Sequence, residues 1–209
     1  MAEPGLLLDW GGVMTTDLRS AFARFCVEEG VEPDRLRMAF RHDRSARDAL
    51  IAYEEGRMGD EQFSLELTRA LGLREERAEG LVLRILDKLE IEPVMVEAVR
   101  AVRAAGVRTV MVSNSWGEGL YPDGLLEELF DDVVISGKEG IRKPHPRMYE
   151  LGAQRAARPP EACVFVDDMP FNLEPARELG MTVIHHTDPR STLEELGALL
   201  GVPLHEYGG

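Results

Sequence analysis

Residues 6–14 read LLLDWGGVM: three leucines lead directly into an aspartate, and two glycines follow it. A short apolar run without polar interruptions is typical of a strand that is buried on both faces of a parallel sheet. Because such a strand is removed from water, an aspartate at its end is costly unless another group compensates its charge. Asp9 is therefore the first candidate for a functional residue.

Similar apolar runs recur along the chain, each bounded by turn residues, and helical patterns lie between them. The runs are Gly5–Asp9, Val107–Ser113, Asp132–Ser136, Ala162–Asp167 and Met181–His186. The helical patterns of this part are Pro93–Ala105, Pro146–Ala157 and Phe171–Leu179. Alternating strands and helices predict an α/β fold with a doubly wound, Rossmann-like and mainly parallel sheet of five strands.

Residues 17–89 break this alternation, since they contain helical patterns only. Asp17 is suited to cap a first helix, and the spacing of apolar residues predicts a last helix over 74–89. A connection of this length must fold on its own. We therefore expect an all-helical cap domain at 17–89, inserted into an α/β core domain made of 1–16 and 90–209. It would cover the strand ends, where open α/β sheets bind ligands.

The composition is that of a globular protein, with 44% apolar and 30% charged residues in 209. A formal net charge of −14 disfavours binding to nucleic acids and to anionic membrane surfaces. The chain shows neither an apolar run of ~18 residues nor the pattern of a signal peptide, so a cytoplasmic location is expected. Cys26 and Cys163 are interpreted as small buried hydrophobic residues. The oligomeric state stays open between monomer and homodimer.

Side chains that could take part in catalysis or metal binding lie where the predicted strands end or in the loops that follow. Since the carboxyl ends of parallel strands share one edge of the sheet, these side chains should lie close together. Two carboxyl groups from separate strands beside a lysine indicate a divalent cation, and hard oxygen ligands favour Mg²⁺ over zinc. The residues are Asp9, Ser113 with Asn114, Lys143, and Asp167 with Asp168.

A reaction follows from these residue types. Asp9 is placed to attack a phosphorus atom and form an aspartyl-phosphate. Two anions must meet in that step, so Mg²⁺ and Lys143 would neutralise the phosphoryl oxygens. The hydroxyl of Ser113 and the backbone N–H of Asn114 would hold the remaining oxygens.

The carboxylates after the fourth run have separate predicted roles. Asp168 is expected to be a metal ligand, while Asp167 and Asn172 are expected to orient the groups around the metal. A basic cluster in the insert, formed by Arg41, His42, Arg44 and Arg47, is compatible with recognition of acidic substrate groups or with a solvated helix face.

The order of these segments resembles the haloacid dehalogenase-like superfamily of phosphohydrolases, over essentially the whole chain. FVDDMPFNLEPARELGM (165–181) and YEEGRMGDEQF (53–63) are similar to segments of its bacterial sugar-phosphate phosphatases and of the N-terminal phosphatase domain of soluble epoxide hydrolases. The resemblance implies an Mg²⁺-dependent hydrolase acting on a small phosphorylated metabolite. Asp9 would be nucleophile and metal ligand, Ser113 the phosphate-binding hydroxyl, Lys143 the charge clamp and Asp168 the second metal ligand.

Gly11 departs from the pattern of the phosphatases that this chain resembles. Most of them carry a second aspartate two residues after the nucleophile, which protonates the leaving group and then activates water. Gly11 keeps the backbone carbonyl that the resemblance assigns to the metal, but it has no side chain for proton transfer. General acid–base help contributes roughly 10²–10⁴ in rate. Three outcomes stay open: another acid, a preference for good leaving groups, or loss of turnover.

Two other functions therefore compete with a phosphomonoesterase. The first is a non-catalytic phospholigand-binding or regulatory protein, which the glycine at position 11 suggests. The second is a 2-haloacid dehalogenase, in which Asp9 would attack carbon without a metal. The Asp167–Asp168 pair speaks against the second, because extra carboxylates beside an anionic substrate repel it unless a cation is present.

Overall fold

The computed structural model describes residues 3–117 and 120–204. Its centre is a parallel sheet of five strands in the order β3-β2-β1-β4-β5. The strands are β1 (Gly5–Leu8), β2 (Arg108–Ser113), β3 (Asp132–Ile135), β4 (Cys163–Asp167) and β5 (Thr182–His185). The doubly wound sheet predicted from the sequence is therefore confirmed, and each strand limit differs from its predicted position by at most one residue.

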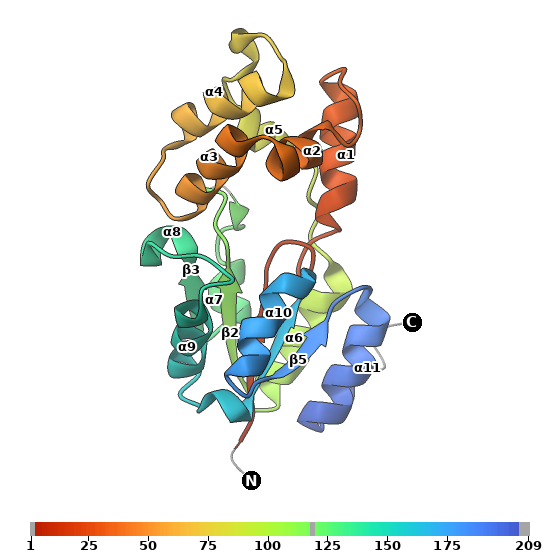
Figure 1. Cartoon of the computed structure of the whole chain (residues 1–209). Coiled ribbons are helices and arrows are strands. Elements are labelled where there is room, and N and C mark those ends of the chain that lie inside the picture. Colours follow the sequence, from red (N-terminus) through yellow and green to blue (C-terminus); the bar gives the residue numbers. More distant parts are fainter. Residues whose placement is uncertain (1–2, 118–119, 205–209) are drawn as a thin grey trace.

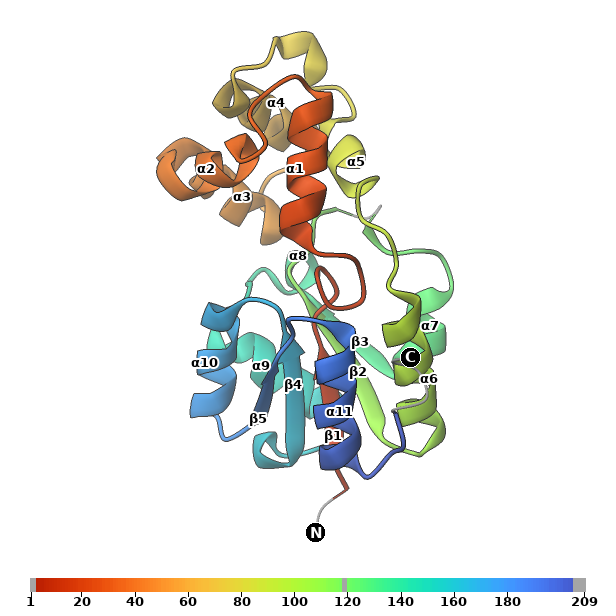
Figure 2. The ribbon, with the colours of Figure 1, turned by 90° about the vertical axis from the view of Figure 1, so that its right-hand side faces the viewer.

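Both faces of the sheet are covered, which explains why its strands read as continuous apolar runs. Helices α6 (Pro93–Ala104), α7 (Leu125–Leu129) and α11 (Pro189–Leu200) pack against the side chains of Leu6 and Leu8. Helices α9 (Pro146–Arg155) and α10 (Pro170–Glu178) cover the other face around Leu7 and Phe165. Figure 2 shows α9 and α10 on one side of the sheet and α6 and α7 on the other.

Residues 17–89 form the helical insert, a body of helices beyond the carboxyl ends of the strands (Figure 1). It contains α1 (Leu18–Glu28), α2 (Arg35–His42), α3 (Arg44–Glu54), α4 (Asp60–Leu71) and α5 (Leu81–Leu86), which bury a hydrophobic cluster of their own. Asp17 caps α1 as expected, since its carboxylate accepts the backbone N–H groups of Arg19 and Ser20.

The helix expected over 74–89 is wrong in extent. The segment forms a 3₁₀ turn at Glu75–Arg77 and then only the short helix α5. Gly80 lies between them with φ +63°, a left-handed conformation that a continuous helix does not contain. The apolar spacing seen in the sequence belongs to the face of α5 and the turn after it, and not to one long helix.

The two connections between the insert and the sheet run side by side. Thr15 and Ile91 form an antiparallel bridge. The N–H of Thr16 donates to the carbonyl of Glu90 at 2.8 Å, and the N–H of Glu92 donates to the carbonyl of Met14 at 2.9 Å. The insert thus begins and ends at the same place. In the part of the chain that the structure describes, no helix has the length and apolar character needed to cross a membrane.

Candidate active site

Lys143 is the centre of the charged cluster at the edge of the sheet. Its Nζ lies 2.7 Å from Oδ1 of Asp9, which follows β1, and 2.7 Å from Oδ2 of Asp167, which ends β4. The side chain is only 1% exposed. Burial by itself lowers the pKa of Lys143, but Asp167 and Asp9 outweigh it and hold the pKa above its usual value. The two carboxylates therefore favour the charged form of the lysine.

Asn114 fixes the backbone of Lys143. Its side-chain Oδ1 accepts the N–H of Lys143 at 2.8 Å, and its Nδ2 donates to the carbonyl of Lys143 at 3.1 Å. This pair of hydrogen bonds joins the end of β2 to the loop before α9. The sequence predicted a phosphate contact through the backbone N–H of Asn114; the structure adds a positioning role for its side chain.

Asp9 lies at the floor of a cavity. Among the described residues, the contacts of its carboxylate all involve one of the two oxygens, Oδ1. Oδ1 accepts the N–H of Trp10 at 2.7 Å and pairs with Lys143. Burial raises the pKa of Asp9 well above its usual value, Lys143 opposes this shift, and the charges of Asp167 and Asp168 add to it. Oδ2 is the oxygen left for a substrate or a cation.

Asp167 is fully buried and tied on both sides. Its Oδ1 accepts the N–H of Met169 at 2.8 Å, and Nδ2 of Asn172 donates to Oδ1 at 2.9 Å and to Oδ2 at 3.1 Å. Asn172 belongs to the first turns of α10, so the helix that follows β4 holds the carboxylate in place. Asp167 in turn holds Lys143; the role around a metal that the sequence suggested for Asp167 stays a prediction.

Asp168 completes a group of three carboxylates. One oxygen each of Asp9, Asp167 and Asp168 lies within 4.8 Å of the other two. Burial, followed by the charge of Asp167, raises the pKa of Asp168 to about 7. Oδ1 of Asp168 is buried and lacks a hydrogen-bond partner among the described residues. A desolvated oxygen of this kind beside two other carboxylates is what a divalent cation would satisfy.

Gly12 provides the space for the Asp168 carboxylate. Its φ is +75°, and a Cβ at this position would lie 2.6 Å from Oδ2 of Asp168. The close approach of the backbone after β1 to the carboxylate after β4 therefore needs glycine at position 12. Together with the unpartnered oxygen of Asp168, this packing fits a hard cation held between the two strand ends.

Ser113 is placed differently from the other predicted residues. It is 1% exposed and lies at the end of β2, where its Oγ accepts a hydrogen bond from the hydroxyl of Tyr121 at 3.0 Å. It is not one of the residues that line the cavity. Its role as a phosphate-binding hydroxyl stays a prediction.

Gly11 lines the same cavity as Asp9. A Cβ at this position would meet Cδ1 of Leu18 at 3.4 Å, an ordinary contact, and its backbone φ is not in the left-handed region. The first residue of α1 thus packs where the acid–base side chain of related phosphatases would begin. Position 11 could still accept a side chain.

A junction around Glu54 was not predicted from the sequence. Glu54 ends α3 of the insert, is buried, and forms an ion pair with Nε of Arg142, the residue before Lys143. Nε1 of Trp116 donates to Oε1 of Glu54 at 3.1 Å, and Oγ of Ser136 donates to its backbone carbonyl at 2.5 Å. Burial raises the pKa of Glu54, and Arg142 opposes that shift. Three core segments therefore meet the insert at one residue.

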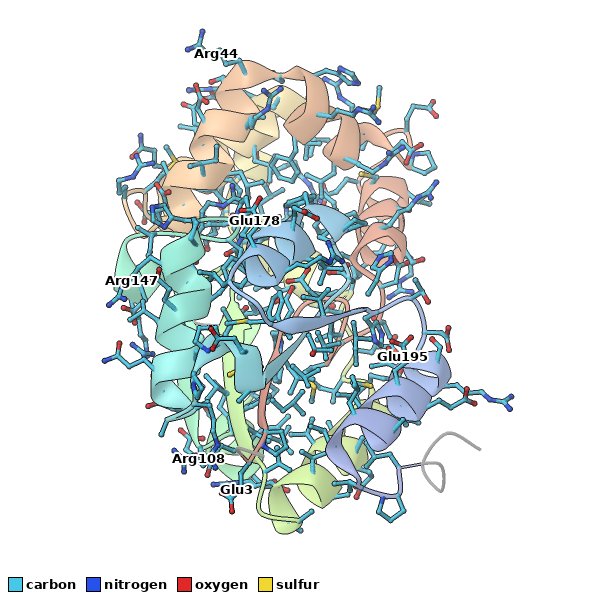
Figure 3. The ribbon with its side chains drawn as sticks, turned by 60° about the horizontal axis from the view of Figure 1, so that its bottom comes forward. Glu3, Arg44, Arg108, Arg147, Glu178 and Glu195 are labelled. Atoms are coloured by element: carbon cyan, nitrogen blue, oxygen red, sulfur yellow. The ribbon has the colours of Figure 1, made fainter. Side chains whose placement is uncertain are left out.

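A cavity of about 430 Å³ lies between the insert and the sheet edge, and the charged cluster forms one end of it. Of the basic cluster named above, Arg41 lines this cavity. Arg47 instead donates to the backbone carbonyls of Phe40 and Arg41. Arg44 points away from the molecule, with a side chain that is 91% exposed (Figure 3). The cluster is therefore divided between the cavity and solvent.

The fold and the cluster together define a parallel α/β protein with carboxylates around a buried lysine at the edge of its sheet, beneath a helical insert. The family model for haloacid dehalogenase-like hydrolases matches residues 6–180, and the chain belongs to this family. The resemblance found in the sequence is thus confirmed.

Relatives with curated functions match about half of the chain. Acyl-CoA dehydrogenase family member 10 of Mus musculus is 41% identical over 117 residues, which is 54% of this chain and 11% of the mouse protein. Bifunctional epoxide hydrolase 2 of Rattus norvegicus is 31% identical over 119 residues, 54% of this chain and 22% of that protein. Fructose-1-phosphate phosphatase YqaB of Escherichia coli is 30% identical over 117 residues, 54% and 60% of the two chains. The chain therefore spans only a small part of the first two relatives.

Solved structures share the fold. A predicted hydrolase of this family from Porphyromonas gingivalis has a TM-score of 0.70 and 22% identity, covering 96% of this chain and 98% of that one. A family member from Bacteroides thetaiotaomicron, solved as a complex with magnesium and inorganic phosphate, has a TM-score of 0.63 and 17% identity, covering 88% of this chain and 93% of that one.

A dehalogenase is also among the relatives by sequence. Haloacetate dehalogenase H-2 of Moraxella is 27% identical, and the match covers 57% of this chain and 56% of the Moraxella protein.

Proposed function

We propose that the chain is an Mg²⁺-dependent phosphomonoesterase that hydrolyses a phosphorylated metabolite through an aspartyl-phosphate on Asp9. The observation that carries the proposal is the cluster in which Lys143 bridges Asp9 and Asp167 beside the unpartnered oxygen of Asp168. A phosphomonoester also appears in the name of the Escherichia coli relative. The helical insert would act as the cap over this site.

Asp9, Asp168 and the backbone carbonyl of Gly11 would hold the metal. When bound, the cation would neutralise phosphoryl oxygens and draw the substrate toward the carboxylates. The buried ammonium of Lys143 would lie on the same anionic group and hold Asp9 in position. Asn114 and Asp167 would keep Lys143 in this place through the hydrogen bonds described above.

The proposed chemistry has two steps. A carboxylate oxygen of Asp9 forms a bond to phosphorus while the bond between phosphorus and the leaving oxygen breaks. With glycine at position 11, the leaving oxygen takes its proton from water. A second water molecule then attacks the phosphorus of the aspartyl-phosphate, which releases inorganic phosphate and restores the carboxylate of Asp9. Exclusion of bulk water by the insert would strengthen the electrostatic contacts in both steps.

Hydrolysis of a phosphomonoester is favoured over the dehalogenase reaction, in which Asp9 would attack carbon, because of the charges in the site. A dehalogenase needs no cation, and within the described cluster three carboxylates surround a single lysine, which disfavours an anionic substrate in the absence of a metal. A phosphomonoesterase with Mg²⁺ removes this conflict. Halide release from 2-haloacids without added metal would reverse the order of the two functions.

An aryl phosphate assay with and without Mg²⁺ tests the proposal. We expect Mg²⁺-dependent turnover by the natural chain and a loss of roughly 10⁴-fold or more in Asp9→Asn, because the nucleophile is removed. The variant should fold, since Lys143 keeps its contact with Asp167; a thermal melt is the control. Tight phosphate binding without turnover over a broad panel would instead favour a non-catalytic phospholigand-binding protein.

A further inference from the structure

The cavity above the charged cluster has walls of a different character from its floor. Its volume of about 430 Å³ is in the range of pockets that enclose drug-sized ligands. Apolar side chains from the helical insert and from core loops make most of the wall, among them Phe22, Phe40, Leu50, Leu89, Trp116 and Phe171.

The aromatic part of this wall is preformed. Trp116, from the core loop after β2, stacks on Phe22 of α1 with ring centroids 5.5 Å apart and an angle of 26°. Phe40 of α2 meets the same indole ring edge-on at 5.9 Å. The indole N–H is already engaged by Glu54. This aromatic part of the wall therefore offers a ligand apolar ring surface and not hydrogen-bond donors.

The polar residues of the cavity fall into a group at the floor and charged residues beside the apolar wall. Asp9, Asn114, Lys143 and Asp168 lie together at the floor. The charges of Glu54 and Arg142 compensate each other in their ion pair. On α2, Arg37 pairs with Asp34 at 3.1 Å, and Arg41 is exposed.

Such a wall discriminates between kinds of organic group. Each methylene group that moves from water into it is worth roughly fourfold in binding. A hydroxyl group buried there without a partner costs roughly tenfold or more. A polyhydroxylated organic group therefore fits poorly beyond the floor, whereas a hydrocarbon group fits well.

We infer that the substrate is a phosphate monoester of a mainly apolar alcohol, with its hydrocarbon part held between the helical insert and the sheet edge. This inference rests on the proposed function, and it adds the class of leaving group. Phe171 supports it from the core side: it lies in the first turn of α10, next to Asn172, lines the cavity, and is 57% exposed. A hydrocarbon group in the cavity would cover this phenyl ring.

A series of n-alkyl monophosphates from ethyl to octyl tests the inference. All are esters of primary alcohols, so the leaving oxygen changes little along the series and only the apolar contact grows. We expect kcat/KM with Mg²⁺ to rise by roughly 100-fold between ethyl and hexyl phosphate. Propyl phosphate should also exceed glycerol 3-phosphate, which has the same carbon chain with two added hydroxyl groups. Values that stay flat with length, or that favour glycerol 3-phosphate, would overturn the inference and leave the phosphatase intact.

A binding measurement separates failure of the inference from failure of the proposed function. Alkylphosphonates of the same lengths are titrated calorimetrically into the natural chain and into Asp9→Asn, in the presence of Mg²⁺. If no phosphate is hydrolysed but phosphonate affinity rises with chain length, the phosphomonoesterase is wrong and the apolar site stands. If affinity does not change with length, the apolar site is wrong whatever the turnover.

A pair of variants locates the effect. Leu50 lines the cavity, so Leu50→Ser should lower kcat/KM for octyl phosphate by about tenfold or more and change ethyl phosphate little. Val27 on α1 is 60% exposed and does not line this cavity, so Val27→Ser is the matched control and should change neither. A loss of equal size on both substrates in Leu50→Ser would indicate a general structural defect and would contradict a contact with the hydrocarbon.

Discussion

The floor and the upper wall of the cavity are built by different parts of the chain and from different residue types. The floor comes from the ends of β1, β2 and β4 with the loop before α9, and it holds carboxylates around one buried lysine. The upper wall comes mainly from the helical insert and is largely apolar and aromatic, with Arg37 and Arg41 of α2 beside it. This difference supports the proposed roles of the two regions. The sheet edge would provide the reactive groups, and the insert would provide the contacts that distinguish one leaving group from another.

The largest effect is expected when Lys143 is removed from the floor, and it concerns the stability of the protein. Lys143→Met leaves buried carboxylates without their cation, so we expect the metal-free protein to lose about 3–5 kcal/mol of unfolding free energy. Added Mg²⁺ should restore part of this loss. Urea unfolding with EDTA and with Mg²⁺ measures both.

Arg44→Met is the matched control on the insert, because Arg44 is exposed and pairs with Asp48 at the surface. Its thermal midpoint should stay within about 2 °C of the natural chain. Equal losses in the two variants would break the distinction between the buried floor and the insert.

The carboxylates of the floor should make metal-free stability depend on pH. The pKa of Asp168 is raised to about 7 by burial and by Asp167, so the folded state holds a proton that the unfolded state has lost. Stability without metal therefore falls as the pH rises from about 4 to 7. Asp168→Asn should remove much of this slope and raise the melting temperature at pH 8 by roughly 5–10 °C.

Calorimetric melts in EDTA from pH 5 to 8 check the sign. The same variant should lose most of the stabilisation that Mg²⁺ gives the natural chain, because a metal ligand is removed. An unchanged slope, together with an unchanged response to Mg²⁺, would take Asp168 out of the metal site.

The smallest effect is expected for a substitution at Gly11, which lies between the floor and the wall of the cavity, and it concerns the rate of hydrolysis. Gly11→Asp places a carboxyl group beside Leu18, at a position whose backbone and space accept a side chain. If turnover is limited by protonation of the leaving oxygen, alkyl phosphates should be hydrolysed roughly tenfold faster and aryl phosphates about equally fast.

Gly11→Asn is the control for this change, since it has the same shape and cannot transfer a proton. A gain in both variants would point to a change in packing, and a gain in neither would show that the site is adapted to glycine. The comparison uses kcat at saturating Mg²⁺, so that differences in metal affinity do not enter.

Much of the floor could be predicted from the sequence because parallel strands bring their carboxyl ends to one edge. Asp9 and Asp167 follow apolar runs and could be placed together without knowledge of the insert. Lys143 follows from its motif, and the structure shows it in contact with both carboxylates, while its role toward a phosphate stays a prediction.

The upper wall could not be predicted in the same way. The ion pair of Glu54 and Arg142 joins residues that are 88 positions apart, and the stacking of Trp116 on Phe22 depends on how the insert folds back onto the core. No local periodicity contains this information. The hydrogen bonds between the Asn114 side chain and the backbone of Lys143 were missed for the same reason, since a side chain that can contact phosphate can equally support a loop.

The bridge between Thr15 and Ile91 has a consequence for how this scaffold can vary. Because the chain leaves and re-enters the sheet-bearing unit at adjacent points, all of the intervening helices could be transplanted or shortened without changing any strand pairing. Evolution could thus change the walls of the cavity while the residues at the strand ends stay the same. A protein engineer could likewise graft a different helical insert at the same two residues.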